Sequence, residues 1–176
     1  TDMAFLHYRS GAFYLQRAKQ LRDTDGVRDI LLSLVAAAED PIAGGRHKVF
    51  GSVPLTIPPQ TSTIASHLPK ALGAAVSITR AKELRVSSKL PSDAVILCSF
   101  GDASVNHATA QATLNACSWI AEQPYPLPLV LLCEDNRIGI SVPTSETWIE
   151  ASVKNRPGFH YIVCDGLNIA DCYAKA

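Results

Sequence analysis

Apolar side chains recur at helical spacing in several stretches of the chain, with polar residues between them, and this pattern predicts several helices. Residues 8–22 and 26–39 carry apolar side chains at helical spacing, and the polar residues 23–26 predict the turn between them. Residues 66–85 predict a third helix, with Pro69 near its start, where proline is tolerated. Its run of small residues suits close packing on a sheet.

Two continuous apolar runs, residues 94–100 and 127–133, predict buried strands. Residues 106–122 lie between them and predict a helix, so the two strands should pair in parallel. A third strand-like run, residues 161–164, precedes an expected C-terminal helix. This order of elements predicts an α/β fold with a doubly wound, mostly parallel sheet and helices on both faces.

Residues 40–59 predict a long loop, because glycine and proline interrupt every possible helix or strand there. A loop of this length inside a compact domain is often functional. The proline-rich residues 123–128 form a local insertion in a helix-to-strand connection, away from the carboxyl ends of the predicted strands. Without an internal repeat or a second domain, residues 1–176 are expected to form a single domain.

Composition narrows the class of protein without identifying it. The 176 residues are 47% hydrophobic, which is enough for one buried core. The formal net charge is zero, so the charge balance gives no indication of nucleic-acid binding. No apolar run predicts a membrane span and no signal segment opens the chain, so we expect a cytoplasmic protein. The five cysteines form no CxxC pair and are assigned no chemistry: Cys98, Cys117, Cys133, Cys164 and Cys172.

An acid and an amide follow the two predicted buried strands. Asp102 comes directly after the first strand, and Asn136 comes shortly after the second. Ligands of open α/β sheets bind at this edge. One carboxylate, one amide oxygen and a backbone carbonyl, here that of Ile138, suit a hard cation such as Mg²⁺ that also takes phosphate oxygens. A helix beginning just after Asp102 would direct free N–H groups at the same phosphates.

Ordinary turn chemistry is the alternative interpretation of both residues. Asp and Asn often follow strands because they cap helices or form turns, and for either residue alone this interpretation is the better one. The occurrence of both at two strand ends favours the diphosphate–metal site.

The motif around Asp102 and Asn136 resembles that of the alpha-type chain of the thiamine diphosphate-dependent decarboxylating component of 2-oxo acid dehydrogenase complexes. Further blocks follow the order of that family: residues 7–11, 44–46, 62–73, 140–146 and 164–168. The later blocks, particularly residues 140–146, are more similar to branched-chain 2-oxo acid enzymes than to pyruvate enzymes. The resemblance implies the thiamine diphosphate-binding fold. It also implies that residues 1–176 are a fragment of a longer chain.

The resemblance assigns further cofactor contacts. Tyr8 and Arg9 match the pair that reaches the diphosphate, where a guanidinium offers paired donors. Ser62 and Ile64 match positions beside the pyrimidine and thiazolium rings. Without the resemblance, Tyr8 and Arg9 are a surface pair, Ile64 is a core residue, and Ser62 caps or turns the chain.

Several positions depart from the family pattern. Ala103 replaces a glycine in the turn after the first strand, so the backbone angles there must be ones that a residue with a Cβ can adopt. The resemblance places both Ala103 and Ser104 at the cofactor. Asp135 replaces an asparagine and adds a negative charge beside the diphosphate. Ile138 replaces a tyrosine without consequence, because its carbonyl is the expected ligand. His47, the candidate catalytic histidine, is shifted by about one position and on its own is typical of a solvated loop residue.

The neighbours of Ser62 fall where some relatives bind potassium: Thr61, Thr63, Ser66 and His67. A histidine is a poor replacement for an oxygen ligand, so we do not predict potassium.

The reaction that the resemblance implies is Mg²⁺- and thiamine diphosphate-dependent oxidative decarboxylation of a 2-oxo acid. The acyl group then passes to a lipoyl group on a transacylase, which makes the enzyme an oxidoreductase with a disulfide acceptor. A pyrimidine-binding beta-type chain or fused domain completes the cofactor cleft, so the protein is expected to be oligomeric. Without that partner the fragment should be inactive, and the sequence does not identify the 2-oxo acid.

Three other interpretations stay open. Another thiamine diphosphate enzyme, such as an acetoin dehydrogenase or a transketolase-like protein, would share the metal motif. A non-catalytic scaffold of the same fold would account for Ala103 and Asp135. An unrelated nucleotide-binding α/β protein is the weakest of the three, because neither a GxGxxG nor a P-loop sequence is present.

Overall fold

The chain is described by a computed structural model that covers residues 2–60, 62–123 and 125–176. A three-stranded sheet lies at its centre in the order β1 (Met3–Phe5), β2 (Ile96–Gly101), β3 (Leu129–Glu134). Both strand pairs are parallel, which confirms the expected pairing of β2 and β3. Strand β1 was not predicted.

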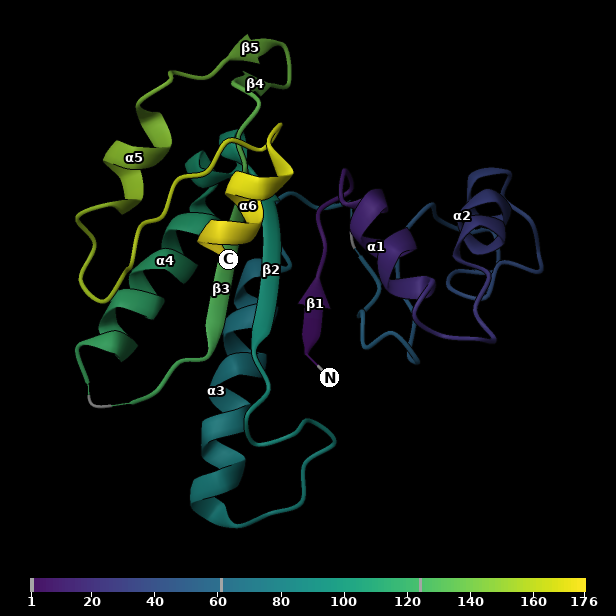
Figure 1. Cartoon of the computed structure of the whole chain (residues 1–176), viewed down its shortest axis with the longest axis horizontal. Coiled ribbons are helices and arrows are strands. Elements are labelled where there is room, and N and C mark those ends of the chain that lie inside the picture. Colours follow the sequence, from purple (N-terminus) through teal and green to yellow (C-terminus); the bar gives the residue numbers. More distant parts are fainter. Residues whose placement is uncertain (1, 61, 124) are drawn as a thin grey trace.

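Helices α3 (Leu68–Leu84) and α4 (Ala108–Ala121) pack together over one face of the sheet (Figure 1). The main core lies between these helices and the sheet, because alternate residues of β2 point toward α3. Its completely buried side chains include Leu68, Ala71, Ala75, Ile96 and Cys98. The small side chains of α3 therefore allow the close packing that the sequence predicts.

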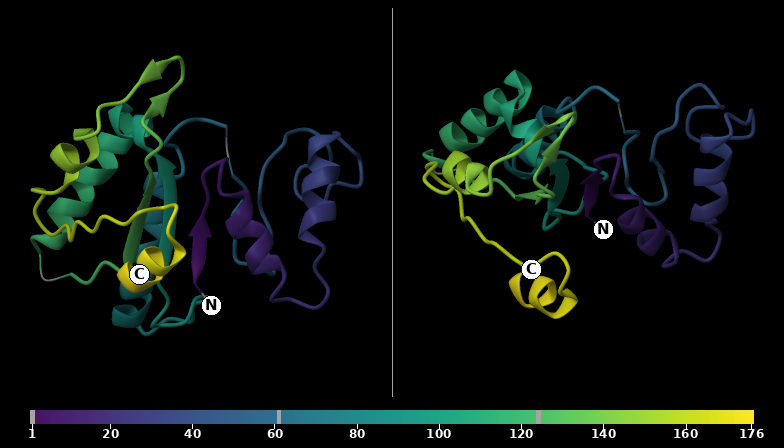
Figure 2. Two further views of the ribbon diagram at one scale, coloured as in Figure 1. Left: turned by 45° about the horizontal axis from the view of Figure 1, so that its top comes forward. Right: turned by 90° about the horizontal axis from the view of Figure 1, so that it is seen from above.

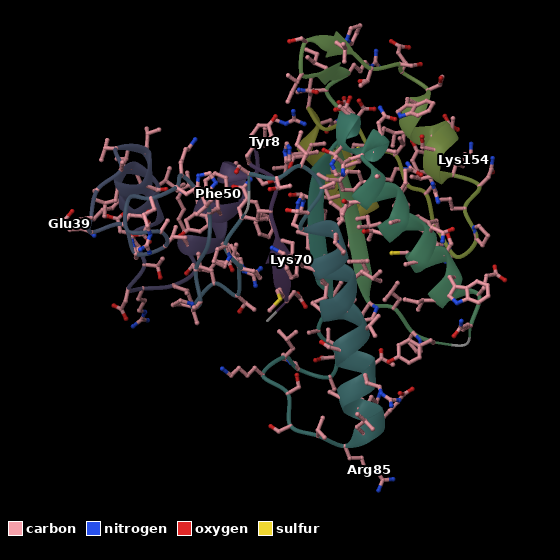
Figure 3. The ribbon with its side chains drawn as sticks, turned by 180° about the vertical axis from the view of Figure 1, so that it is seen from behind. Tyr8, Glu39, Phe50, Lys70, Arg85 and Lys154 are labelled. Atoms are coloured by element: carbon pink, nitrogen blue, oxygen red, sulfur yellow. The ribbon has the colours of Figure 1, made fainter. Side chains whose placement is uncertain are left out.

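Helices α1 (Gly11–Ala18) and α2 (Gly26–Leu34) form a separate lobe beside β1, which we call the α1–α2 lobe together with the loop 35–59 (Figure 2). It has its own cluster of buried residues: Ala4, Leu6, Tyr14, Ala18, Phe50, Leu55 and Ile57. Phe50 lies inside this lobe and Glu39 at its outer end, whereas Tyr8 lies where the lobe meets the sheet (Figure 3). Both helices are shorter than predicted.

The helix expected over residues 106–122 begins later than predicted. A 3₁₀ helix, η1 (Asp102–Asn106), follows β2 directly, and the extended backbone of His107 separates it from α4. The His107 side chain accepts a hydrogen bond from the Thr109 N–H at 3.2 Å. A free helix N-terminus directly after Asp102 was therefore a wrong expectation, because η1 intervenes and a side chain caps α4.

The chain after β3 forms a short antiparallel hairpin of β4 (Ile138–Gly139) and β5 (Val142–Pro143), followed by α5 (Trp148–Val153). The sequence did not predict either element. The hairpin projects beyond the carboxyl ends of β2 and β3 (Figure 1).

Residues 161–164 were expected to form a strand, and that expectation was wrong. The segment is irregular and leads to helix α6 (Ile169–Lys175). Ile162 and Val163 are 62% and 66% exposed, so they lack the burial that favours an apolar strand.

The mixed α/β class with a parallel sheet and helices is confirmed. Helices on both faces of a doubly wound sheet stay a prediction, since Val130 and Leu132 on β3 are 49% and 45% exposed. Within the residues that the structure describes, no helix is long and apolar enough to cross a membrane.

Candidate functional site

Asp102 occupies the position where β2 ends and η1 begins. Its side chain is only 1% exposed. The Oδ2 atom accepts a hydrogen bond from the Thr144 hydroxyl, whereas Oδ1 is buried and has no hydrogen-bond partner among the described residues. A buried acceptor without a donor costs free energy in a protein. This oxygen is therefore available to a ligand that the chain itself does not provide.

Ala103 occupies its turn without backbone strain. It lies in η1, and it is not one of the described non-glycine residues that have a positive φ. The change from glycine to alanine therefore forces no residue with a Cβ into the left-handed region. A Cβ placed on Gly139 would lie 3.1 Å from the Ala103 Cβ, which shows how closely β4 approaches η1. The Ser104 carbonyl accepts from the His107 N–H at 3.0 Å and closes the 3₁₀ turn.

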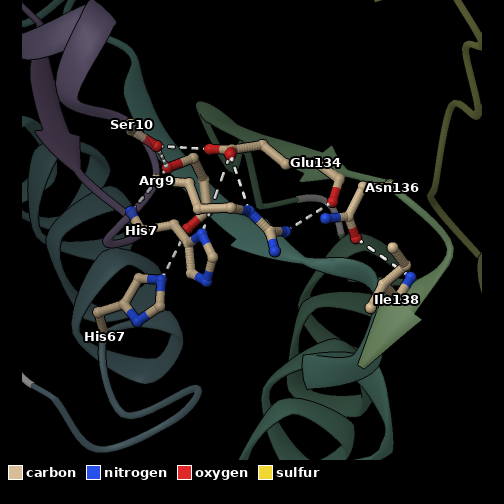
Figure 4. A network of polar contacts seen from close by, with 8 residues as sticks. His7, Arg9, Ser10, His67, Glu134, Asn136 and Ile138 are labelled. Atoms are coloured by element: carbon tan, nitrogen blue, oxygen red, sulfur yellow. Dashed lines mark hydrogen bonds and ion pairs between the residues drawn. The ribbon is translucent and has the colours of Figure 1, made fainter. Parts of the chain in front are cut away.

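Asn136 and Ile138 follow β3 in two successive side-chain turns. The Asp135 carboxylate accepts from the Arg137 N–H at 3.1 Å, and Asn136 Oδ1 accepts from the Ile138 N–H at 3.2 Å (Figure 4). These are the turn contacts of the alternative interpretation. They do not exhaust the Asn136 oxygen, because an amide carbonyl has two lone pairs.

Arg9 joins the ends of β2 and β3. Its Nη2 donates to the Glu134 carbonyl at 3.0 Å, and its Nε lies 3.7 Å from Glu134 Oε2. A Cβ on Gly101 would come within 2.8 Å of Arg9 Nη2, so glycine leaves room for the guanidinium. The ring of Tyr8 lies 5.6 Å from Arg9 Cζ, within cation–π range, and Tyr8 is 59% exposed.

Ser99 of β2 is the centre of a buried polar network that includes His7, Ser10 and His67. Figure 4 shows the three partners together with Arg9 and Glu134. The Ser99 hydroxyl accepts from the His7 N–H and shares a hydrogen bond with the Ser10 hydroxyl, both at 2.8 Å. Ser10 also donates to Glu134 Oε1, and His67 Nε2 donates to the Ser99 carbonyl at 2.7 Å. These contacts connect the segment between β1 and α1, strands β2 and β3, and the residue that precedes α3.

Burial and hydrogen-bond donors or acceptors have opposite effects on the pKa values of Glu134 and His67, two titratable groups of this network. Burial by itself would raise the pKa of Glu134, but His7, Ser10 and Arg9 together lower it below its ordinary value. Burial lowers the pKa of His67 more than its hydrogen bond to Ser99 raises it. Glu134 is therefore held as a carboxylate and His67 as a neutral imidazole.

Among the described residues, no hydrogen bond joins Asp102 to three other predicted site residues, His47, Ser62 and Ile64. The His47 carbonyl accepts from the Ser33 hydroxyl of α2 at 3.4 Å, which ties His47 to the α1–α2 lobe. Ser62 and Ile64 are exposed on the loop before α3, and Thr61 beside them lies outside the described residues. A tertiary contact to a different helix thus explains the position of His47.

The donor set around Asp102 suits a hard cation. Among residues 2–60, 62–123 and 125–176, no cluster of three or more His, Cys, Asp and Glu side chains could hold a metal. A site built from one carboxylate, one amide oxygen and one carbonyl would not form such a cluster. The unpartnered Asp102 oxygen fits Mg²⁺ shared with a phosphate.

Sequence reasoning missed two residues of this site, Thr144 and Glu134. Thr144 lies in the block 140–146, which carried a resemblance but no role. Glu134 ends a predicted strand and offered no separate signal, because its partners Arg9 and Ser10 are far away in the sequence.

Comparison with known proteins gives a family match over nearly the whole chain. The model of the family described as "Dehydrogenase E1 component" matches residues 1–168.

Two individual relatives share low sequence identity with this chain. The mitochondrial 2-oxoisovalerate dehydrogenase subunit alpha of Mus musculus is 25% identical over 162 residues, which cover 90% of this chain and 32% of the relative. The 2-oxoisovalerate dehydrogenase subunit alpha of Bacillus subtilis is 28% identical over 118 residues, covering 66% of this chain and 32% of the relative. The chain thus spans about a third of the length of these two relatives.

Proposed function

Because this chain belongs to the dehydrogenase E1 component family, we propose that it supplies the diphosphate- and metal-binding part of a thiamine diphosphate-dependent 2-oxo acid dehydrogenase. The observation that carries the proposal is the buried, unpartnered Oδ1 of Asp102 at the carboxyl end of β2. Family membership implies the cofactor class, and this atom supports the proposed position of the cation.

The residues present fit the cofactor and its cation. Asp102 Oδ1, the Asn136 side-chain oxygen and the Ile138 carbonyl would hold Mg²⁺, while Arg9 and Tyr8 would bind the diphosphate. Asp102, Glu134 and Asp135 place several acidic groups near the strand ends, so an anionic diphosphate needs a cation between itself and the protein. Thiamine diphosphate, when bound, supplies the decarboxylation chemistry itself.

The chain's own task in this proposal is to bind and orient the cofactor. Arg9 is held at the end of β3 by the carbonyl and the carboxylate of Glu134, so its remaining N–H groups can point in one direction. Ala103 and Ser104 in η1 would line the diphosphate side. Ser62 and Ile64, which are exposed on the loop before α3, would contact the rings of the cofactor.

The activity of the whole protein is a wider proposal, since the chain covers about a third of its relatives. We propose oxidative decarboxylation of a 2-oxo acid with transfer of the acyl group to a lipoyl carrier. The names of the relatives favour a branched-chain substrate. The proposed partners are a beta-type chain or fused domain and a lipoyl-bearing transacylase. We also propose that residues 1–176 form a single doubly wound domain and that the protein is cytoplasmic.

A non-catalytic scaffold is the second candidate. One observation favours it: Asn136 Oδ1 is already used by the Ile138 N–H, and Asp135 adds a charge beside it. Such a protein would fold normally and would not bind thiamine diphosphate.

Calorimetric titration distinguishes the two candidates. Thiamine diphosphate is titrated with and without Mg²⁺ into the intact protein together with its partner domain, and into Asp102→Ala and Asn136→Ala variants. Asp93→Ala is the matched control, because Asp93 is exposed just before the opposite end of β2. Mg²⁺-dependent binding that is lost only at Asp102 and Asn136 supports the enzyme. Absence of binding by the folded parent would leave the scaffold.

A further inference from the structure

The β4–β5 hairpin connects the two halves of the proposed metal site. It leaves the end of β3 with Asn136 and Ile138, and it returns to Asp102 at Thr144, immediately after β5. The return is fixed by backbone contacts, since Ile138 pairs with Pro143 and the Thr144 N–H donates to the Arg137 carbonyl at 2.9 Å.

The hairpin also rests directly on the turn that carries Asp102. Gly139 packs against Ala103 so closely that a Cβ on Gly139 would lie 3.1 Å from the Ala103 methyl and 3.1 Å from a Val142 methyl. The position of Thr144 relative to Asp102 is therefore set by packing as well as by the pairing of β4 with β5.

The Thr144 hydroxyl divides the Asp102 carboxyl group into two unlike oxygens. It donates to Oδ2, while Oδ1 stays buried without a donor. One hydrogen bond of this kind restricts rotation of the carboxyl group about χ2, which is otherwise a broad torsion. The oxygen that is left free then has a fixed direction.

We propose that Thr144 is a positioning residue for the metal site. Its hydroxyl holds Oδ2 of Asp102 so that Oδ1 is presented to the cation, and the β4–β5 hairpin delivers Thr144 from the same segment that carries Asn136 and Ile138. This inference rests on the proposed function, because it takes Asp102 as the Mg²⁺ ligand. It assigns a role to the block 140–146, which the proposed function leaves without one.

The size of the effect follows from metal sites in general. Loss of a hydrogen bond that orients a metal ligand typically weakens metal affinity 10- to 100-fold. Direct loss of the ligand should have a larger effect. The hydroxyl group and not the bulk of Thr144 should matter.

The test measures the Mg²⁺ concentration needed for half-maximal binding of thiamine diphosphate by the intact protein with its partner. Thr144→Val removes the hydroxyl and preserves the shape, and Thr144→Ser restores the hydroxyl. Thr147→Val is the matched control in the same segment, because Thr147 is exposed and its hydroxyl contacts only Ser145 among the described residues. The metal-free unfolding midpoint of each variant is recorded in parallel.

We expect Thr144→Val to need about 10 to 100 times more Mg²⁺, with Thr144→Ser and Thr147→Val close to the parent. If Thr144→Val does not fold, the comparison of Thr144→Ala with Thr144→Ser decides in the same way. A normal Mg²⁺ requirement without the hydroxyl, alone or with a lowered unfolding midpoint, would overturn the positioning role.

The Asp102→Ala variant separates this inference from the proposed function. Loss of binding in Asp102→Ala with a normal Mg²⁺ requirement in Thr144→Val overturns the role of Thr144 and leaves the cofactor site standing. Normal Mg²⁺-dependent binding by Asp102→Ala overturns both.

Discussion

Two buried aspartates, one in the α1–α2 lobe and one at the edge of the sheet, illustrate different uses of the same side chain. Asp40 is 4% exposed and Asp102 is 1% exposed. The Asp40 carboxylate accepts from the N–H groups of Ile42, Ala43 and Gly45 at 3.0, 3.2 and 3.4 Å. Asp102 accepts from one hydroxyl, and its second oxygen accepts from no described group.

Burial alone therefore does not mark a functional carboxylate. Asp40 folds its own loop around itself, so its hydrogen bonds are local and complete. Asp102 receives its one donor from Thr144, more than forty residues away, and is left incomplete. The incomplete aspartate is the better candidate for a ligand site, because a buried acceptor without a donor is otherwise a cost.

The loop that Asp40 organises also contains His47. The loop around Asp40 continues into His47, whose carbonyl is held by Ser33, and Val49 N–H donates to the Ser33 hydroxyl at 3.2 Å. This segment is thus part of the packing of the lobe. The catalytic role of the His47 imidazole stays a prediction, because this contact involves only the backbone carbonyl of His47.

The largest expected effect on stability is in the lobe. Asp40→Ala removes the acceptor of three backbone N–H groups and should lower the free energy of unfolding by about 3 kcal/mol. Denaturant unfolding monitored by circular dichroism measures this change. Asp93→Ala, at an exposed position, is the control and should change stability little. An Asp40→Ala variant as stable as the parent would remove the structural half of the comparison.

Asp102→Asn should have the opposite sign in the absence of cofactor. The amide keeps an oxygen for the Thr144 hydroxyl and removes a buried charge that is only half satisfied, so metal-free stability should rise by about 1 kcal/mol. The parent alone should then be stabilised further by Mg²⁺ with thiamine diphosphate, by about 2.7 kcal/mol at a hundredfold excess over Kd. Thermal unfolding with and without both ligands tests this pair of results. A destabilised, ligand-responsive Asp102→Asn variant would contradict it.

The sheet edge should also respond to mild acid through His67. Its pKa is lowered in the folded protein by burial, so the unfolded chain binds more protons as the pH falls below 6.5. Stability should therefore decrease below pH 6.5, down to the lowered pKa. His67→Gln keeps a donor for the Ser99 carbonyl and should flatten the dependence of the unfolding midpoint on pH in that window. An unchanged slope would show that His67 does not cause it.

Glu134 should act at lower pH. Its pKa is lowered from 4.5 in the folded protein, so its contribution to stability is present above that value and is lost as the pH falls through the lowered pKa. Glu134→Gln should show a smaller loss of stability below pH 4.5 than the parent. Asp93→Ala again serves as control. This effect should be the smallest of the four, because Glu134 is partly exposed and solvent screens it.

Much of the central fold could be predicted because its elements are marked by local patterns. Helix α2 begins at the predicted Gly26, capped by Asp25. The apolar runs of β2 and β3 are too hydrophobic for a surface, and the helix between them requires a parallel crossover. Strand β1 is only three residues long, and the β4–β5 hairpin pairs two residues with two, so neither has a period to detect.

Part of the candidate site could also be predicted, namely the acid and the amide that follow buried strands. Their placement at one edge follows from parallel pairing alone. The contacts of Thr144 with Asp102 and of Arg9 and Ser10 with Glu134 could not be predicted, because each joins residues distant in the sequence. The same holds for His47, whose position is decided by its contact with α2.

The parallel pairing of β2 and β3, the acid and amide that follow them, and membership of the dehydrogenase E1 component family could all be inferred from the sequence. Hydrophobic runs, turn residues and sequence motifs are local patterns, so the strands, the acid and the amide can be recognised before the fold is known. The folded structure was needed to find which buried aspartate keeps an oxygen without a described partner and which hydroxyl contacts its other oxygen. Hydrogen-bond satisfaction depends on groups that meet only after the chain has folded, and no local pattern records it.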